Sequence, residues 1–248
     1  MQEITSVNND LVKETVKLQQ KKYRDNKFLL EGQKSIEEAN RAGLDINYIF
    51  VLKGKEKNYT NIKAELILTT EPVLKKISTT DSAPEAVAVA YKKSFDIKIL
   101  HNAKKVVLLE NIKDLGNLGT ILRTSAAFDF DAIILYGKDS ADLYNPKCVR
   151  STVGNLWKVP VFYIEKIDEL KSYFKDFERI ATLPRANEYL KDFKPQLPSL
   201  VMFGSEADGL SEDLIKFSTK SVKIEMSPDV ESLNLSVSCA IVLYKFME

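Results

Sequence analysis

Short apolar runs separated by polar segments and by helical patterns predict an α/β fold for the first part of the chain. Strand-like runs fall at residues 28–32, 46–52, 65–70 and 86–91. Three helices are predicted around them: one with apolar spacing from Leu11 to Leu18, one from a Ser35-x-x-Glu38 capping box to Gly43, and one from Glu71 to Ile77. These elements predict a small α/β domain over residues 1–95.

A second alternation follows a polar stretch that predicts a linker over residues 96–104. Its strand-like runs are 105–110, 132–137, 159–164, 179–184, 200–205 and 221–226. Strands that alternate with helices of about ten residues imply a mostly parallel sheet covered on both faces. The second domain is therefore predicted over residues 105–248, with ligands expected where loops leave the carboxyl ends of its strands.

The composition is that of a soluble globular protein. Of the 248 residues, 44% are hydrophobic, and 36 Lys and Arg nearly balance 35 Asp and Glu. The sequence shows neither an apolar run long enough for a membrane span nor a secretory signal. Cys148, Cys239 and His101 lack the number and spacing of a disulfide framework or a zinc site. We therefore expect no metal and a reducing, cytoplasmic setting.

Basic residues concentrate near the N-terminus, although the formal net charge is only +1. The cluster falls on or just after the first predicted helix and consists of Lys13, Lys17, Lys21, Lys22, Arg24 and Lys27. One interpretation is a solvated helix face. The other is a surface that attracts phosphates.

Two loops of the second domain carry polar residues beside glycines. Asn117, Gly119 and Arg123 form N-x-G-x-x-x-R on a predicted strand-to-helix turn, where the arginine can grip a phosphate or simply be exposed. The loop FGSEADGL (203–210) places Glu206 at a strand end, either as a functional acid or as a helix-capping or solvent-facing one. Neither loop has the G-x-G-x-x-G fingerprint, which disfavours a nicotinamide or flavin oxidoreductase.

A third loop, KIEMSPDVESLNLSVSCA (223–240), leads from a strand into the last helix. Ser232, Leu233 and Asn234 open that helix, so Ser232 is either an N-cap or part of a ligand-binding turn. An apolar stripe then follows at helical spacing, and it is either core or a subunit interface: Leu233, Val237, Ala240, Ile241 and Tyr244.

Together the three loops resemble the three ordered motifs of the SpoU/TrmH class of SPOUT RNA 2′-O-ribose methyltransferases. The matching stretches are NLGTILR (117–123), FGSEADGL (203–210) and KIEMSPDVESLNLSVSCA (223–240), with NPKCVRSTVGNLWKVPV (145–161) similar to the middle segment of the family. The N-terminal part resembles the ribosomal-protein-like substrate-binding domain that precedes the catalytic domain in many members. The resemblance covers nearly the whole chain.

The resemblance implies an α/β-knot methyltransferase domain with a trefoil knot near the C-terminus, S-adenosylmethionine as cofactor, and a homodimer that shares its active site. The catalytic positions carried over are Asn117, Arg123, Glu206, Ser232 and Asn234. The cofactor-binding positions are Phe203, Gly204, Ser205, Gly209, Ile224, Met226 and Leu233. The RNA-binding candidates are Lys13, Lys17, Lys21, Lys22, Arg24 and Arg150. Structured RNA is the expected partner, ribosomal RNA before transfer RNA, with neither DNA nor a membrane.

Three residues depart from the family pattern. Ala207 stands where a glycine is usual, Glu225 where a proline is usual, and Asp129 where a glycine often ends the helix of the first motif. Ala207 and Glu225 fall in the cofactor loops. They therefore favour the alternative function, a non-catalytic RNA-binding protein that retains the methyltransferase scaffold, whereas the intact polar motif positions oppose it.

Overall fold

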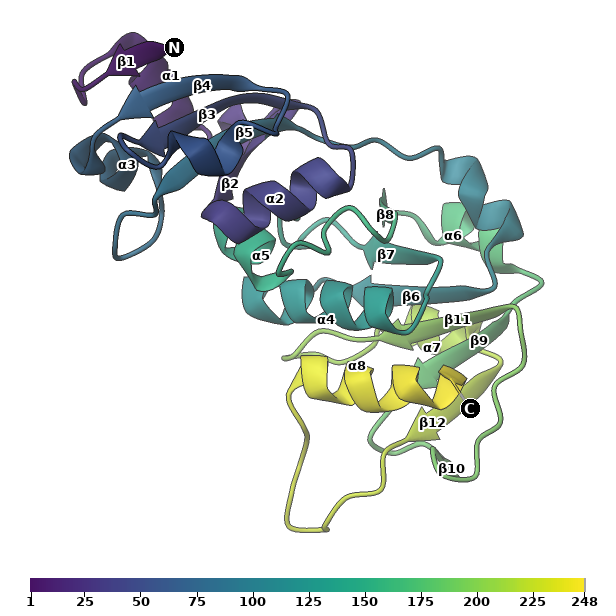
Figure 1. Ribbon diagram of the computed structural model, residues 1–248. Coiled ribbons are helices and arrows are strands. Elements are labelled where there is room, and N and C mark those ends of the chain that lie inside the picture. The colour runs from purple at the N-terminus through teal and green to yellow at the C-terminus, as the bar shows by residue number, and fades with distance from the viewer. Residues whose placement is uncertain (248) are drawn as a thin grey trace. The chain divides into compact units, whose positions relative to one another are not determined.

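The computed structural model describes residues 1–247 and shows two compact units (Figure 1). The first unit combines Met1–Ser94 with Asp142–Trp157, and the second combines Phe95–Ala141 with Lys158–Glu248. The first unit thus includes a segment that the sequence assigns to the second domain, 105–248. Glu248, the last residue of that predicted domain, lies outside the described residues.

The first unit is built on a five-stranded mixed sheet. Its strands lie in the order β1 (Gln2–Ile4), β4 (Glu65–Thr69), β3 (Ile46–Leu52), β5 (Ala86–Tyr91) and β2 (Lys27–Glu31). The first three are parallel, while β5 runs antiparallel to both β3 and β2. The helical segments are α1 (Asp10–Lys17), η1 (Lys21–Tyr23), α2 (Gln33–Arg41), η2 (Glu56–Tyr59) and α3 (Glu71–Ile77).

One core of this unit lies between its sheet and the helices α1 and α3. Val12 of α1 and Val73, Leu74 and Ile77 of α3 pack against strand residues such as Phe50. Because successive strand side chains point to opposite faces, each buried strand supplies this core at every second position. The nearly continuous apolar sequence of β3 and β5 follows from the burial of side chains on both of their faces.

The segment Asp142–Trp157 packs against β2 through its helix α5 (Pro146–Ser151). The ring of Tyr144 lies 4.9 Å from that of Phe28, centroid to centroid. At Gly154 the backbone approaches so closely that a Cβ there would lie 2.6 Å from Cβ of Glu38. This contact, together with the positive φ of Gly154, requires glycine at the position.

The second unit is built on a seven-stranded sheet in which every strand pairing is parallel. Its order is β10 (Glu188–Tyr189), β12 (Lys220–Lys223), β9 (Glu178–Thr182), β11 (Ser199–Phe203), β6 (Lys105–Glu110), β7 (Ala132–Tyr136) and β8 (Val161–Ile164). The central strands β6 and β11 are buried on both faces, as a sheet covered by helices requires.

Helices cover this sheet. Helices α6 (Ile167–Phe174) and α7 (Glu212–Phe217) pack against a core that contains Val106, Leu108 and Met202. Helices α4 (Leu115–Ala127) and α8 (Leu235–Tyr244) lie side by side. The 3-10 helices are η3 (Ile97–Asn102), inside the predicted linker, and η4 (Lys245–Met247).

Some predicted element ends are wrong. Helix α2 begins at Gln33 with Gly32 at its N-cap, so Ser35 lies in the first turn and its buried hydroxyl has no hydrogen-bond partner. The capping box therefore does not form. Strand β12 ends at Lys223, three residues before the predicted end. Strand β1 has three residues and strand β10 has two, which is too short for an apolar–polar alternation to predict either of them.

Among the described residues, the structure contains no helix of the length and hydropathy that crossing a membrane requires.

Candidate active site

Three loops of the second unit leave the carboxyl ends of neighbouring strands and bring the polar motif residues together. The loop after β6 leads into α4, whose first turn carries Asn117. The loop after β11 carries Glu206, and the loop after β12 ends at Asn234. Strand β11 lies between β6 and β9, and β9 pairs with β12. Parallel strands place their carboxyl ends along one edge, which is why residues far apart in sequence meet here.

Asn117, Glu206 and Asn234 form a chain of hydrogen bonds. Nδ2 of Asn117 donates to Oε1 of Glu206 at 2.9 Å, and Nδ2 of Asn234 donates to Oδ1 of Asn117 at 3.0 Å. The Asn117 side chain therefore has both of its hydrogen-bond partners on other loops, one as acceptor and one as donor. Three of the five predicted catalytic residues are in direct contact.

Asn234 is fixed by its second role as the N-cap of α8. Its Oδ1 accepts from the amide N–H groups of Ser236 at 2.9 Å and Val237 at 3.4 Å. The oxygen is thus committed to the helix end, which leaves Nδ2 to face Asn117. Ser232 is not the N-cap that the sequence offered as one alternative; it lies exposed two residues earlier.

The first motif lies inside α4 rather than on a turn before it. The carboxylate of Asp114 accepts the amide N–H of Asn117 at 2.7 Å and caps the helix, so helical structure begins at Leu115. Gly119 is buried, whereas Arg123 is exposed and makes no hydrogen bond or ion pair with any described residue. The guanidinium of Arg123 is therefore available to a ligand.

A cavity of about 530 Å³ lies beside this chain of hydrogen bonds. All seven predicted cofactor-binding residues line it, together with Glu206, Ser232 and Asn234. Its size and its mixture of apolar side chains with a few polar groups suit a nucleoside-sized ligand. One part of the wall is not predicted from the sequence: the end of β9 and the loop after it, with Thr182, Leu183 and Pro184. That loop carries no polar motif, so only its position beside β11 and β12 reveals it.

The loop after β11 closes tightly on itself at one edge of the cavity. Ser205 and Gly209 exchange backbone hydrogen bonds of 3.2 and 3.1 Å. A Cβ at Gly204 would lie 1.9 Å from the carbonyl carbon of Gly209 and 2.1 Å from the amide nitrogen of Leu210. Glycine is therefore required at position 204 by the backbone itself, before any ligand is considered.

A second cavity, of about 620 Å³, adjoins the first and shares Ser205, Glu206 and Asn234 with it. Asn117 and Lys113 line only the second cavity. The hydrogen-bonded chain thus borders both spaces. A group held in one cavity and a group held in the other would each be near the same three side chains.

The three departures from the family pattern have local explanations. The exposed Ala207 lines the second cavity but not the first. Glu225 is exposed, pairs with Lys191 at 2.7 Å, and does not line the first cavity although Ile224 and Met226 do. Asp129 has φ +52° just after α4, so it adopts the left-handed conformation that a glycine commonly adopts there.

The apolar stripe of α8 is not core in the single chain. Val237, Ile241 and Tyr244 are 47%, 40% and 57% exposed, whereas the opposite side of the helix buries Cys239, Val242 and Leu243. These exposures argue against the core alternative for the three residues, and the subunit interface stays a prediction.

The N-terminal basic cluster separates into exposed lysines and one buried arginine. Lys13, Lys17, Lys21 and Lys22 are exposed. Arg24 is only 3% exposed, which corrects its assignment as an RNA-binding residue. Its Nη1 donates to the carbonyl oxygens of Leu18 and Gln19, both at 2.7 Å, and its Nη2 lies 2.5 Å from Oδ2 of Asp142. Because the side chain is almost wholly buried and four of its five N–H groups donate within the protein, it offers a phosphate little access.

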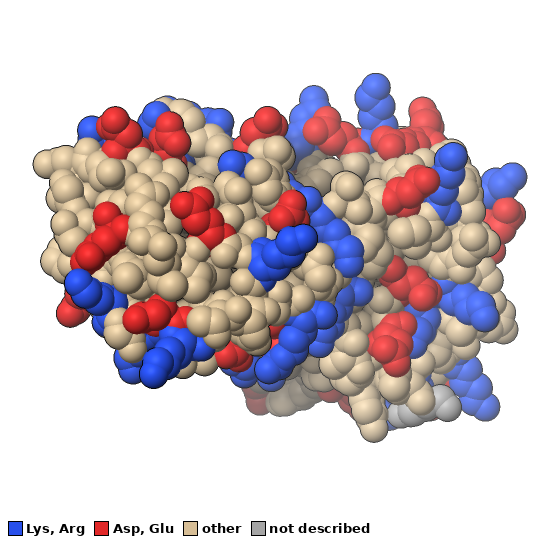
Figure 2. Space-filling view, turned by 45° about the horizontal axis from the view of Figure 1, so that its top comes forward, with Lys and Arg blue, Asp and Glu red and all other residues tan. Residues whose placement is uncertain are grey.

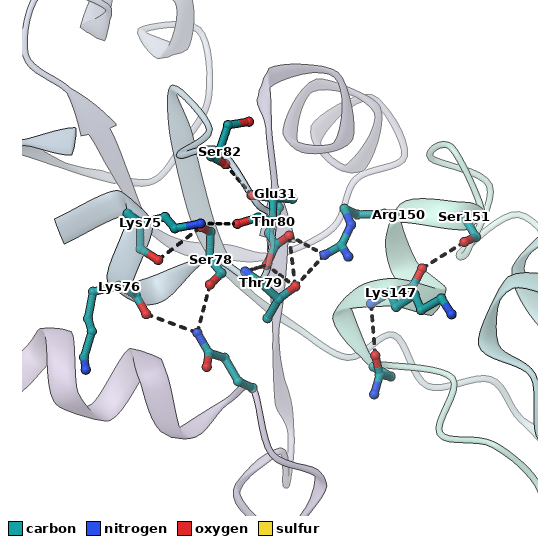
Figure 3. Close-up of polar contacts among 12 residues, drawn as sticks. Glu31, Lys75, Lys76, Ser78, Thr79, Thr80, Ser82, Lys147, Arg150 and Ser151 are labelled. Carbon is teal, nitrogen blue, oxygen red and sulfur yellow. Dashed lines mark hydrogen bonds and ion pairs between the residues drawn. The ribbon is translucent and has the colours of Figure 1, made fainter. Parts of the chain in front are cut away.

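Arg150 has a structural partner inside the first unit (Figure 3). Its Nη1 donates to Oε2 of Glu31 and to Oγ1 of Thr79, both at 2.5 Å. The Glu31 side chain is buried, and it also accepts the backbone N–H of Thr79 at 2.8 Å. Arg150 therefore neutralises a buried carboxylate, although its side chain remains 31% exposed.

The visible face in Figure 2 carries both kinds of charge, with Asp and Glu side chains interspersed among Lys and Arg and several basic side chains gathered near the middle of the view. Residues 1–247 contain no group of three or more His, Cys, Asp or Glu side chains that could hold a metal ion.

Comparisons with known proteins match both parts of the chain. Residues 104–244 match the family model described as the SpoU rRNA Methylase family, and residues 9–88 match the MRM3-like substrate binding domain. An uncharacterized tRNA/rRNA methyltransferase of Synechocystis sp. is 34% identical and covers 98% of this chain and 92% of its own length. A 23S rRNA (guanosine(2553)-2′-O)-methyltransferase of Bacillus subtilis is 30% identical over 98% of each chain.

A solved structure supports the same grouping. The AdoMet-bound rRNA methyltransferase from Sinorhizobium meliloti superposes with a TM-score of 0.88 at 25% identity, and the match covers 99% of this chain and 97% of that one.

Proposed function

Because this chain belongs to the SpoU rRNA methylase family, we propose that it transfers a methyl group from S-adenosylmethionine to a ribose 2′-hydroxyl of RNA. The observation that carries the proposal is the chain of hydrogen bonds from Glu206 through Asn117 to Asn234, which borders both cavities. The first cavity is proposed for the cofactor and the second for the target ribose. Phe203, Gly204, Ser205, Gly209, Ile224, Met226 and Leu233 are the proposed cofactor contacts.

The proposed chemistry needs alignment more than activation of the methyl donor. The cofactor, when bound, would supply a sulfonium methyl carbon that is already electrophilic. The 2′-oxygen would bond to that carbon as the carbon–sulfur bond breaks, the sulfur would leave as the neutral thioether of S-adenosylhomocysteine, and the hydroxyl proton would pass to solvent water. A ribose hydroxyl is a very weak acid, so the protein must position its oxygen against the methyl carbon and stabilise the negative charge that develops on it.

Arg123 is the proposed catalytic cation. A guanidinium is hard to deprotonate in proteins, so the role that fits its chemistry is to clamp a phosphate and stabilise the forming alkoxide. Asn117 and Asn234 supply amides that can orient the ribose, and Ser232 lines the cofactor cavity at the same helix mouth. Glu206 holds the amide of Asn117 in one orientation.

A homodimer is part of the proposal. The support is the exposed stripe of Val237, Ile241 and Tyr244 on α8, which a second copy covers in this proposal, and α4, which carries Arg123, lies beside α8. Covering that stripe would remove three large apolar side chains from water. Arg123 of one subunit would then lie at the border of the shared site. A trefoil knot in the cofactor loops is proposed from the family resemblance.

The catalytic proposal is favoured over a non-catalytic RNA-binding scaffold. The two residues that favoured the scaffold, Ala207 and Glu225, both stay outside the lining of the first cavity. Ribosomal RNA is proposed before transfer RNA because the N-terminal part matches the MRM3-like substrate binding domain and the B. subtilis relative is named for 23S rRNA.

Transfer of a labelled methyl group tests the proposal. Purified protein is incubated with methyl-labelled S-adenosylmethionine and, separately, with unmodified ribosomal RNA, ribosomal subunits and transfer RNA. We expect the wild-type protein to label free ribosomal RNA or the RNA of ribosomal subunits. The Arg123→Ala variant should label neither. Failure to label any RNA by a protein that binds the cofactor as a dimer would support the scaffold instead.

A further inference from the structure

The connection between α1 and β2 presents an exposed aromatic ring among lysines. Tyr23 ends the 3-10 helix η1 and is 44% exposed. Nζ of Lys22 lies 4.8 Å from the centroid of its ring, and Nζ of Lys17 lies 5.9 Å from it. We call these three side chains the Tyr23 platform. Its ring face is held next to positive charge, in water, with no enclosing protein core.

The backbone under this platform is fixed. Arg24, the next residue, ties the end of α1 to Asp142 through the buried contacts already described. The turn itself is closed by hydrogen bonds from the amide N–H of Tyr23 to the carbonyl of Gln20 at 3.1 Å, and from that of Arg24 to the carbonyl of Lys21 at 3.0 Å. The ring is therefore presented by a preorganised turn, which lowers the entropic cost of binding a ligand to it.

The charged groups that lie against the Tyr23 ring are the two lysines of the platform, and the exposed Asp25 follows two residues later. Among the described residues of the first unit, the other exposed large hydrophobic side chains are Met1, Val7 and Val153, none of which belongs to the turn that carries Tyr23. A protein-binding surface would need further apolar neighbours. Lys92 adds to the positive charge nearby: its Nζ bonds to the carbonyl oxygen of Arg24 at 2.5 Å.

We propose that the Tyr23 platform is a stacking site for an unpaired base of the substrate RNA, with Lys17 and Lys22 taking the adjacent phosphates. The inference rests on the proposed function for the presence of RNA. A tyrosine face stacks on any base, but only on one that is not already stacked inside a duplex. The lysines are exposed and flexible, so each can move from the ring to a phosphate when the base arrives.

The test compares one RNA sequence in two forms. Fluorescence anisotropy measures binding of the full-length protein, without cofactor, to a labelled twelve-nucleotide single strand and to the corresponding blunt duplex. We expect Tyr23→Ala to weaken single-strand binding about tenfold or more and to change duplex binding less than about twofold. Tyr23→Phe should retain single-strand affinity within about threefold because stacking needs the ring and not the hydroxyl.

Charge variants separate the phosphate contacts from the stacking. Lys22→Gln should reduce the slope of log affinity against log salt by about 0.7, as expected for one phosphate contact on a single strand. Lys57→Gln, an equal charge change on the exposed η2, should leave the slope unchanged.

Three results would overturn the inference: an unchanged single-strand affinity in Tyr23→Ala, an equal loss on single strand and duplex, or an equal loss in Tyr23→Phe. Because binding is measured without methyl transfer, the two proposals can fail separately. If the wild-type protein methylates RNA but Tyr23→Ala binds the single strand with unchanged affinity, only the stacking-site proposal is refuted. If binding depends on Tyr23 but no RNA is methylated, only the proposed enzyme function is refuted.

Discussion

The side-chain amide of Asn234 donates to Oδ1 of Asn117 at 3.0 Å, although 117 residues separate the two along the chain. The same Asn234 caps α8 with its oxygen. One side chain therefore both starts the last helix and orients the first motif, which couples the stability of the helix to the geometry of the site.

Substitution of Asn234 should separate these two roles. Asn234→Ser keeps an oxygen for the helix cap but removes the donor to Asn117. We expect its free energy of unfolding to stay within about 0.5 kcal/mol of wild type. Its kcat for methyl transfer should fall about fivefold, since one positioning hydrogen bond is worth roughly 1 kcal/mol.

Asn234→Ala is the matched comparison and should lose stability as well, by about 1 kcal/mol in urea unfolding. Equal stability of the two variants would show that Asn234 does not cap the helix in solution. Full activity of Asn234→Ser would show that its bond to Asn117 has no part in catalysis.

Arg123→Ala should abolish methyl transfer while S-adenosylmethionine still binds. The exposed guanidinium has no partner among residues 1–247 and does not line the first cavity, so its removal leaves that cavity intact. Arg123→Lys keeps the charge but loses the bidentate fork, and we expect it to recover only part of kcat. Isothermal titration with the cofactor provides the second measurement. Loss of cofactor affinity in parallel with kcat would refute this division of labour.

Gly204→Ala should damage the cofactor cavity through the backbone. The added Cβ would collide with Gly209 and Leu210 at about 2 Å, so the loop must move. We expect cofactor affinity to fall at least tenfold and the melting temperature to drop. Ala207→Gly is the control in the same loop: Ala207 is exposed and outside the first cavity, so its affinity should change less than about threefold. A wild-type affinity in Gly204→Ala would contradict this account of the loop.

Arg150→Ala should destabilise the first unit. It leaves the buried carboxylate of Glu31 without its cation, and a cost of about 3 kcal/mol is expected for a broken buried pair with one partly exposed partner. Adding Glu31→Gln should restore part of that loss, because the buried charge is then gone. Urea unfolding of the two single variants and the double variant measures the coupling. Additive losses would mean that the two side chains do not interact in solution.

Alkaline pH should destabilise the protein through its buried thiols. Burial raises the pKa of Cys148 to about 12, with Asp142 adding to the shift, and burial also raises that of Cys239. A thiol with a raised pKa in the folded chain contributes full stability below its unfolded pKa, about 8.5, and loses it as pH rises toward the folded value. The free energy of unfolding should therefore decline above about pH 9, with a shallower decline in Cys148→Ala. If the free energy of unfolding falls with pH equally in the wild type and in Cys148→Ala, the buried thiol of Cys148 does not cause the decline.

Most of the α/β alternation could be predicted from the sequence because buried parallel strands read as short apolar runs. The positions of Asn117, Glu206 and Asn234 could be inferred from their places after strand ends, but their direct contact depends on the strand order, which local patterns do not encode. The burial of Arg24 depends on Asp142, a partner more than a hundred residues away. Nothing in the spacing of the basic cluster distinguishes Arg24 from the exposed Lys22.

Element ends were less predictable where side chains compete for a cap. Ser35-x-x-Glu38 satisfies the capping pattern, yet α2 starts from Gly32, which adopts φ +84° directly after the strand. Asn234 rather than Ser232 starts α8, because the side-chain oxygen of Asn234 accepts the amide N–H groups of Ser236 and Val237. The docking of Asp142–Trp157 onto β2 rests on tertiary packing, which no local pattern in that segment reveals.

The position of the transferred methyl group tests the central claim most directly. RNA methylated by the wild-type protein is hydrolysed in alkali, which cleaves beside a free 2′-hydroxyl but not beside a methylated one. The account predicts that the label remains in alkali-resistant dinucleotides and is absent when Arg123→Ala is used. Label recovered on a base in single nucleotides would contradict it, because the proposed site would then not act on the ribose.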